Sequence, residues 1–263
     1  MTATTPAPYA RAVRGSGPGL VVAHGAGGGV EANYGPIMEG LAAQRTVVGV
    51  DYPGSGDTPA TTAPLDLDQL RDQLVAAADA EGLDTFALSG YSLGGPVAMR
   101  LAARHPERVT SLILSATFAH PNTRTDLALA LWERLLLTGD PTLAAQYATL
   151  LAMGAPALNS LTPAQVDAAV KETAATAAPA AARQVGLARR VDVREDVATL
   201  TVPTLVIVTT ADAMVPPAIQ RQLAAALPDA TVAEIATGHM PFVEQPAQWL
   251  KLITEFLGRH SHA

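Results

Sequence analysis

The stretch Gly90-Tyr91-Ser92-Leu93-Gly94 follows an apolar run at residues 85–89 and precedes an amphipathic run at residues 97–104. It matches the G-x-S-x-G pattern of a sharp turn between a strand and a helix. The flanking glycines fit such a turn, because a Cβ there would collide with neighbouring elements. The turn would raise the Ser92 hydroxyl above the sheet edge, at a helix N-terminus where backbone N–H groups favour a developing anion. The stretch therefore predicts a nucleophilic serine, and its place between strand and helix argues against a chance match.

Short apolar runs and longer amphipathic runs alternate on both sides of this turn. The apolar runs predict strands at residues 20–23, 46–50, 85–89, 109–115, 204–209 and 231–235, and the amphipathic runs predict helices at residues 66–80, 97–104 and 245–257. This alternation is typical of a parallel sheet covered by helices. Residues 118–197 show only Leu- and Ala-rich helical stretches broken by prolines. We therefore predict an α/β core made of residues 1–117 and 198–263, interrupted by a helical cap at residues 118–197.

The composition excludes several classes of protein. The chain has 263 residues, of which 49% are hydrophobic and 16% charged, with a formal net charge of −7 and no cysteine. No run of about 18 apolar residues is present, so we expect no membrane span. Without a basic cluster we expect no nucleic-acid partner, and without cysteine there is neither a disulfide nor a thiol nucleophile. The first 15 residues lack the apolar core of a secretory signal, so we expect a cytoplasmic protein.

His239 is the best candidate for the general base that a serine nucleophile needs. It lies in a loop after the last predicted strand, where functional side chains are common. The alternative is a histidine that caps or shapes the turn. The other histidines fit less well: His105 ends a predicted helix, His120 lies at the start of the cap, where it would line a pocket at most, His24 precedes a glycine-rich loop, and His260 and His262 lie in a polar tail that we expect to be solvated.

Asp212 directly follows the predicted strand at residues 204–209. A carboxylate there would share a sheet edge with Ser92 and His239, because parallel strands end at the same edge. It would fix the tautomer of His239 and stabilise the imidazolium. The alternative is an N-cap for a helix beginning near Pro216. The order Ser92, Asp212, His239 matches the Ser…Asp…His order of one hydrolase class.

A glycine-rich loop, His24-Gly25-Ala26-Gly27-Gly28-Gly29, follows the first predicted strand. Phosphate binding is the rival interpretation, but the loop lacks the lysine of a P-loop and the spacing of a dinucleotide site. An oxyanion hole fits better, with N–H donors from Ala26 and Leu93. We expect His24 and Gly25 to support this loop and take no part in the chemistry. We expect neither a cofactor nor a metal ion.

These motifs together resemble the α/β-hydrolase superfamily, in its serine-nucleophile, esterase- and lipase-like branch. The resemblance covers about residues 20–257. It rests on four segments: the His24-Gly25 loop, the elbow around Ser92, Asp51-Tyr52-Pro53-Gly54-Ser55-Gly56-Asp57-Thr58, which has Thr58 where serine is usual, and Gly238-His239-Met240-Pro241-Phe242-Val243-Glu244-Gln245-Pro246. The resemblance implies the α/β-hydrolase fold, with a mostly parallel central sheet, flanking helices and a helical cap inserted after the sixth strand. About ten residues around Tyr9 to Gly15 precede the first predicted strand, so the family's first antiparallel strand is expected to be missing or very short.

The expected activity is hydrolysis of a carboxylic ester through an acyl-enzyme intermediate. The leucine-rich cap and a set of large side chains near the site predict an apolar pocket for an uncharged acyl or alkyl group of a small molecule. Those side chains are Tyr34, Tyr91, Phe118, Trp132, Met214 and Met240. Since aromatic residues make up only 4% of the chain, we expect mainly aliphatic walls. The alternatives are a C–C bond hydrolase, an acyltransferase or thioesterase, and a non-catalytic ligand receptor on the same fold.

Overall fold

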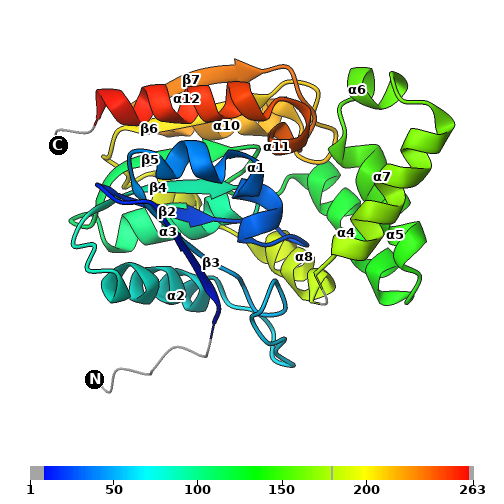
Figure 1. Cartoon of the computed structure of the whole chain (residues 1–263), viewed down its shortest axis with the longest axis horizontal. Coiled ribbons are helices and arrows are strands. Elements are labelled where there is room, and N and C mark those ends of the chain that lie inside the picture. The colour runs from blue at the N-terminus through cyan, green and yellow to red at the C-terminus, as the bar shows by residue number, and fades with distance from the viewer. Residues whose placement is uncertain (1–8, 179, 261–263) are drawn as a thin grey trace.

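A seven-stranded sheet forms the centre of the computed structural model, which describes residues 9–178 and 180–260 (Figure 1). Its spatial order is β1 (Arg11–Arg14), β3 (Thr46–Val50), β2 (Gly19–Ala23), β4 (Phe86–Tyr91), β5 (Val109–Ser115), β6 (Thr204–Thr209) and β7 (Ala230–Ile235). All neighbours pair in parallel except β1, which runs antiparallel to β3. Parallel strands end at one edge, so the loops after β2, β4, β6 and β7 share that edge.

The antiparallel strand β1 settles the expectation about the start of the sheet. It is present but only four residues long, with Arg11 opposite Val50. One strand therefore precedes β2 among the described residues, and the helical insertion follows β5, the fifth strand in chain order. The prediction of an insertion after a sixth strand was wrong in its count, although the insertion begins after the predicted strand at residues 109–115.

Helices cover both faces of the sheet. On one face lie α1 (Val30–Ala42) and α12 (Pro246–Arg259), and on the other lie α2 (Leu67–Ala80), α3 (Gly94–Arg104) and α10 (Pro217–Ala226). The short helix α11 (Pro241–Glu244) leads into α12. Asp66 begins α2, where its carboxylate accepts from the N–H groups of Asp68 and Gln69. Within the described residues, no helix is both long and apolar enough to cross a membrane.

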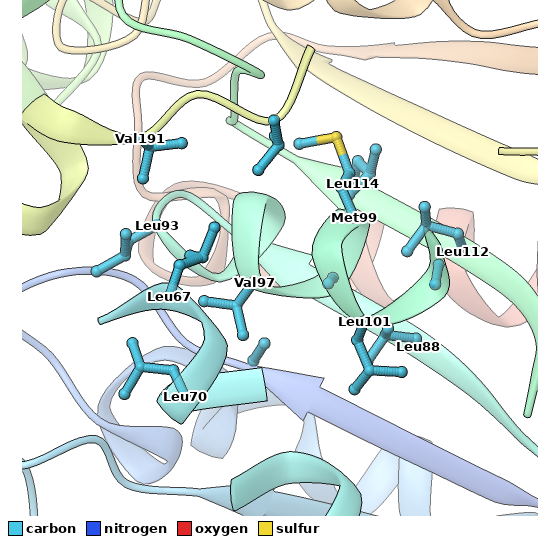
Figure 2. Packing of buried hydrophobic residues seen from close by; sticks show 14 of the residues in the cluster. Leu67, Leu70, Leu88, Leu93, Val97, Met99, Leu101, Leu112, Leu114 and Val191 are labelled. Atoms are coloured by element: carbon cyan, nitrogen blue, oxygen red, sulfur yellow. The ribbon is translucent and has the colours of Figure 1, made fainter. Parts of the chain in front are cut away.

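The larger of the two cores lies under α2 and α3 (Figure 2). Leu88 of β4 and Leu112 of β5 project from the sheet and are fully buried with Val97 and Leu101 of α3. Burying side chains of this size stabilises the fold by about 1.5–3 kcal/mol each. The core therefore fixes α3 against β4 and β5, and with it the turn that connects β4 to α3.

Residues 118–197 form a helical insertion between β5 and β6. Its helices are α4 (Thr123–Leu137), α5 (Pro141–Ala152), α6 (Ala155–Asn159), α7 (Pro163–Thr176), α8 (Ala181–Arg190) and α9 (Arg194–Val197). Side-chain caps begin three of them: Asn122 at α4, Asp140 at α5 and Thr162, in a capping box with Gln165, at α7. In Figure 1, α4, α5, α6 and α7 lie together at one end of the molecule.

Candidate active site

Ser92 occupies the turn between β4 and α3 in a strained backbone conformation. Its φ of +51° lies in the left-handed region that residues with a Cβ rarely adopt. The neighbouring glycines have no room for a side chain: a Cβ on Gly90 would lie 2.5 Å from the carbonyl oxygen of Gly94, and one on Gly94 would lie 2.0 Å from that of Ala23. The Ser92 carbonyl accepts a 2.7 Å hydrogen bond from the Thr117 hydroxyl, which also fixes the turn.

Ser92, His239 and Asp212 form a hydrogen-bonded chain. The Oγ of Ser92 lies 2.9 Å from the Nε2 of His239, and the Nδ1 of His239 lies 2.8 Å from the Oδ2 of Asp212. An ionised carboxylate can only accept, so Nδ1 carries a proton and Nε2 of the neutral ring is left to accept from the serine hydroxyl. The Asp212 side chain is fully buried, and that of His239 is 5% exposed. This geometry can remove a proton from Ser92.

Asp212 is held by groups on both of its oxygens. Its Oδ1 accepts from the N–H groups of Met214 and Val215, at 2.9 and 2.8 Å. Its Oδ2, besides contacting His239, accepts from the Thr209 hydroxyl at 2.9 Å and the Gln220 amide at 3.3 Å. Asp212 is therefore not the N-cap of α10, which follows Pro216 without a side-chain cap. One of its oxygens binds the turn before that helix, and the other faces His239.

The predicted oxyanion donors are unpaired. Neither the N–H of Ala26 nor that of Leu93 hydrogen bonds to any described residue. The loop after β2 lies against the elbow, since a Cβ on Gly25 would be 3.0 Å from the Cβ of Ser92. Two free N–H groups beside Ser92 can donate hydrogen bonds to a negatively charged oxygen.

His24 supports this loop from within the core. Its Nε2 accepts from the N–H of Tyr52 at 3.0 Å, and its Nδ1–H donates to the carbonyl of Gly25 at 2.8 Å. The ring is fully buried, with its centroid 3.9 Å from that of the Tyr52 ring. Burial disfavours the charged form and lowers the pKa of His24 to about 4. His24 is therefore neutral at pH 7 and serves as a hydrogen-bonded brace.

A cavity of about 920 Å³ opens above Ser92 and His239. Of the six side chains predicted to line it, five do so: Tyr91, Phe118, Trp132, Met214 and Met240. Tyr34 does not, so that prediction was wrong. Its side chain is fully buried between α1 and the sheet, where its hydroxyl donates to the Ser89 carbonyl at 3.0 Å.

Alanine is the commonest residue of the described cavity lining. One helix of the insertion, α5, contributes Ala144, Ala145, Ala148 and Ala152. The lining residues that the structure describes include two carboxylates, Asp140 and Glu172, and neither lysine nor arginine. The cavity is therefore wide, and its walls are mostly aliphatic. None of the described lining residues is a lysine or arginine that could pair with an anionic ligand.

The remaining histidines lie away from the serine. His105 ends α3, as expected, and His120 contacts the Val191 carbonyl at 3.0 Å without lining the cavity. His260 is half-buried against Phe256 and not fully solvated, and His262 lies outside the described residues. Among the described residues, no group of three or more His, Asp or Glu side chains is arranged to hold a metal ion.

Two polar side chains make contacts around the site that were not predicted: Gln220 lies in no motif, and Tyr91 was predicted only to line the pocket. The Gln220 amide binds Thr209 and Asp212, and the Tyr91 hydroxyl donates to the His239 carbonyl at 2.9 Å. Burial raises the pKa of Tyr91 well above its usual value, so this hydroxyl remains a donor. Glu244, by contrast, lies in the motif from Gly238 to Pro246, so its position in the sequence could have marked it as part of the site.

Comparison with known proteins shows the family to which this chain belongs. Residues 18–246 match the family model of the alpha/beta hydrolase fold. The chain is 32% identical over 247 residues to pyrrolizixenacetamide deacetylase of Xenorhabdus hominickii, covering 93% of this chain and 92% of that protein. It is 30% identical over 253 residues to a pimeloyl-[acyl-carrier protein] methyl ester esterase of Aeromonas hydrophila, covering 93% of this chain and 97% of that protein.

The fold itself matches solved structures over nearly its full length. The enol-lactonase from Burkholderia xenovorans LB400 superposes with a TM-score of 0.84 at 22% identity, covering 95% of this chain and all of that chain. The family match spans strands β2 to β7, the turn at Ser92 and the loop that carries His239. The chain therefore belongs to the alpha/beta hydrolase fold family.

Proposed function

We propose that this protein is a serine esterase that hydrolyses carboxylic esters of bulky, uncharged small molecules through an acyl-enzyme. The observation that carries the proposal is the hydrogen-bonded chain from Ser92 through His239 to Asp212 at the base of an apolar cavity. The two relatives are named as a deacetylase and a methyl ester esterase, in line with an enzyme that removes acyl or ester groups.

In the first half-reaction, the Oγ of Ser92 attacks the ester carbonyl carbon while Nε2 of His239 takes the hydroxyl proton. The carbonyl oxygen becomes an oxyanion that accepts from the N–H groups of Ala26 and Leu93. Asp212 stabilises the imidazolium. The intermediate then collapses, the C–O bond to the leaving alcohol breaks, and His239 donates its proton to the departing oxygen.

In the second half-reaction, water attacks the Ser92 acyl ester. His239 takes a proton from the water, a second oxyanion forms at the same place, and collapse returns the proton to Ser92 and releases the acid. We further propose that the helical insertion, residues 118–197, acts as the cap that forms the outer wall of the substrate pocket.

The preference for an uncharged substrate rests on the lining. A carboxylate drawn into this cavity would lose water and find no cation among the described lining residues. Burying such a charge without a partner is strongly unfavourable. An aliphatic chain, by contrast, gains about 25 cal/mol for each Å² of surface removed from water.

A fluorophosphonate probe and a series of p-nitrophenyl esters test the proposal. We expect the probe to label Ser92 in the folded protein and ester turnover to disappear in Ser92→Ala. Absence of labelling, with a control serine hydrolase reacting, would exclude Ser92 as a nucleophile and favour a ligand receptor. Labelling without turnover of any ester would favour acyl transfer or C–C bond hydrolysis.

A further inference from the structure

Gln184, on α8 of the helical insertion, joins two loops of the core. Its side chain is fully buried. The Oε1 atom accepts from the N–H of Gly27 at 2.8 Å, and the Nε2 atom donates to the Ser55 hydroxyl at 2.8 Å and the Pro53 carbonyl at 3.4 Å. The group of Gly27 that faces Gln184 is its N–H, a donor, and that of Pro53 is its carbonyl, an acceptor, so the orientation of the amide is fixed.

The partner of Gln184 is the residue after a predicted oxyanion donor. Gly27 has a φ of +77°, and its carbonyl accepts from the N–H of Ala178 at 3.1 Å. Both backbone polar groups of Gly27 are therefore held by the insertion. The preceding N–H, that of Ala26, is left unpaired beside the cavity.

We propose that Gln184 is a positioning residue, which holds the loop at residues 24–29 so that the Ala26 N–H faces the oxyanion. This inference rests on the proposed esterase function. A donor that is displaced by part of an ångström weakens the transition state more than the bound ester, because the full negative charge exists only in the transition state. Loss of Gln184 therefore lowers kcat and leaves KM nearly unchanged.

The loop keeps other anchors when Gln184 is replaced. The Gly25 N–H donates to Asn33 at 2.9 Å, and His24 binds Tyr52. The expected defect is thus a misplaced donor in a folded protein.

The test uses Gln184→Met, which keeps the length of the side chain but removes its hydrogen bonds. We expect Gln184→Met to lower kcat on p-nitrophenyl butyrate about 10- to 100-fold with KM within about twofold. The inhibition constant of butylboronic acid, whose tetrahedral adduct with Ser92 fills the oxyanion site, rises in parallel with the loss of kcat.

Gln73→Met is the matched control, because Gln73 is also a buried glutamine but lies on α2 outside the cavity lining. It should leave kcat unchanged. If Gln184→Met does not fold, Ser55→Ala removes one partner of Gln184 and should lower kcat at constant KM. If a folded variant keeps the wild-type kcat, or if only its KM rises, the inference is overturned and the esterase proposal remains intact. A wild-type protein that turns over no ester overturns the esterase proposal itself.

Discussion

The backbone N–H of His239 donates a 2.6 Å hydrogen bond to the carbonyl oxygen of Ala152, the last residue of α5. Glu244 reinforces this contact, since its carboxylate accepts from the N–H groups of both Gly154 and Gly238. The insertion therefore holds His239 by its backbone, and the position of the proposed general base depends on the insertion as well as on the core.

The close approach of Gly238 to Gly154 predicts a defect in Gly238→Ala. A Cβ on Gly238 would lie 2.1 Å from the nitrogen of Gly154, so the two segments must separate. We expect the free energy of unfolding to fall by about 1–3 kcal/mol and kcat to fall with it. Gly258→Ala is the control: it lies in α12 with open space around it, and the same change there should stabilise by about 0.5 kcal/mol. Equal Tm values for both variants in a thermal melt would contradict this prediction.

The strained backbone of Ser92 predicts that two variants lose activity equally but differ in stability. Both Ser92→Gly and Ser92→Ala lose the hydroxyl, and each should lower kcat by a factor of about 10⁴ or more. Only glycine relieves the φ of +51°. Urea unfolding should therefore show Ser92→Gly to be more stable than Ser92→Ala by about 1 kcal/mol. Alanine as the more stable variant would show that the turn stores no strain.

The buried contact between Asp212 and His239 predicts a large loss of activity in Asp212→Asn. The asparagine can keep an oxygen toward the N–H groups of Met214 and Val215 while its NH₂ faces His239. Nδ1 of His239 then accepts from this NH₂, and the neutral ring carries its proton on Nε2. Nε2 therefore cannot accept the proton of the Ser92 hydroxyl. We expect kcat to fall about 10⁴-fold, and Tm to fall modestly because the Thr209 hydroxyl and the Gln220 amide lose their acceptor. A loss of less than tenfold would exclude Asp212 as the partner that sets the tautomer.

The depressed pKa of His24 predicts acid sensitivity. The unfolded chain binds a proton at His24 below about pH 6.5, whereas the folded protein binds it only near pH 4. The unfolded state therefore holds more protons in this window, and stability falls as the pH falls through it. Acidification from about pH 6.5 to pH 4 therefore lowers the free energy of unfolding by about 3–4 kcal/mol, at about 1.4 kcal/mol for each pH unit.

Urea unfolding of wild type and His24→Gln at several pH values between 4 and 7 checks this prediction. The glutamine variant is less stable at pH 7 but should lose less stability on acidification. Parallel curves for the two proteins would rule out His24 as the source.

The absence of a cation among the described lining residues predicts discrimination between two acyl chains of equal length. We expect kcat/KM for mono-p-nitrophenyl adipate, which ends in a carboxylate, to be at least about tenfold lower than for p-nitrophenyl hexanoate. Glu172→Lys places a cation in the lining and should narrow the difference. Equal kcat/KM values in the wild type would contradict the preference for uncharged substrates.

The strands and the residues of the hydrogen-bonded chain could be read from the sequence because each has a local signature. The strands at residues 46–50, 109–115 and 204–209 match β3, β5 and β6. Ser92, Asp212 and His239 each follow a strand. Because these parallel strands end at the same edge of the sheet, residues far apart in the chain could be predicted to lie close together.

Helix α1 gave no such signature. Gly35, Pro36 and Gly40 lie inside it, and residues of these types disfavour an isolated helix. Packing of Ile37 and Leu41 against the sheet stabilises it instead. The wrong prediction for Tyr34 has the same cause. Tyr34 lies on α1, and without a predicted helix the direction of its side chain could not be predicted.

Gln184 shows the other limit. It lies in an alanine-rich helix and contacts Gly27, 157 positions away in the chain. A single buried amide leaves no periodic pattern, so its role emerges only when the fold brings the two segments together.

The alanine lining has a consequence for how substrate range can change. Alanine is nearly the smallest side chain, so almost every substitution along α5 at Ala144, Ala145 or Ala148 adds volume to the wall. Each added methylene group removes space for one carbon atom of a ligand. Point mutations at these positions can therefore narrow the set of accepted molecules far more readily than they can widen it.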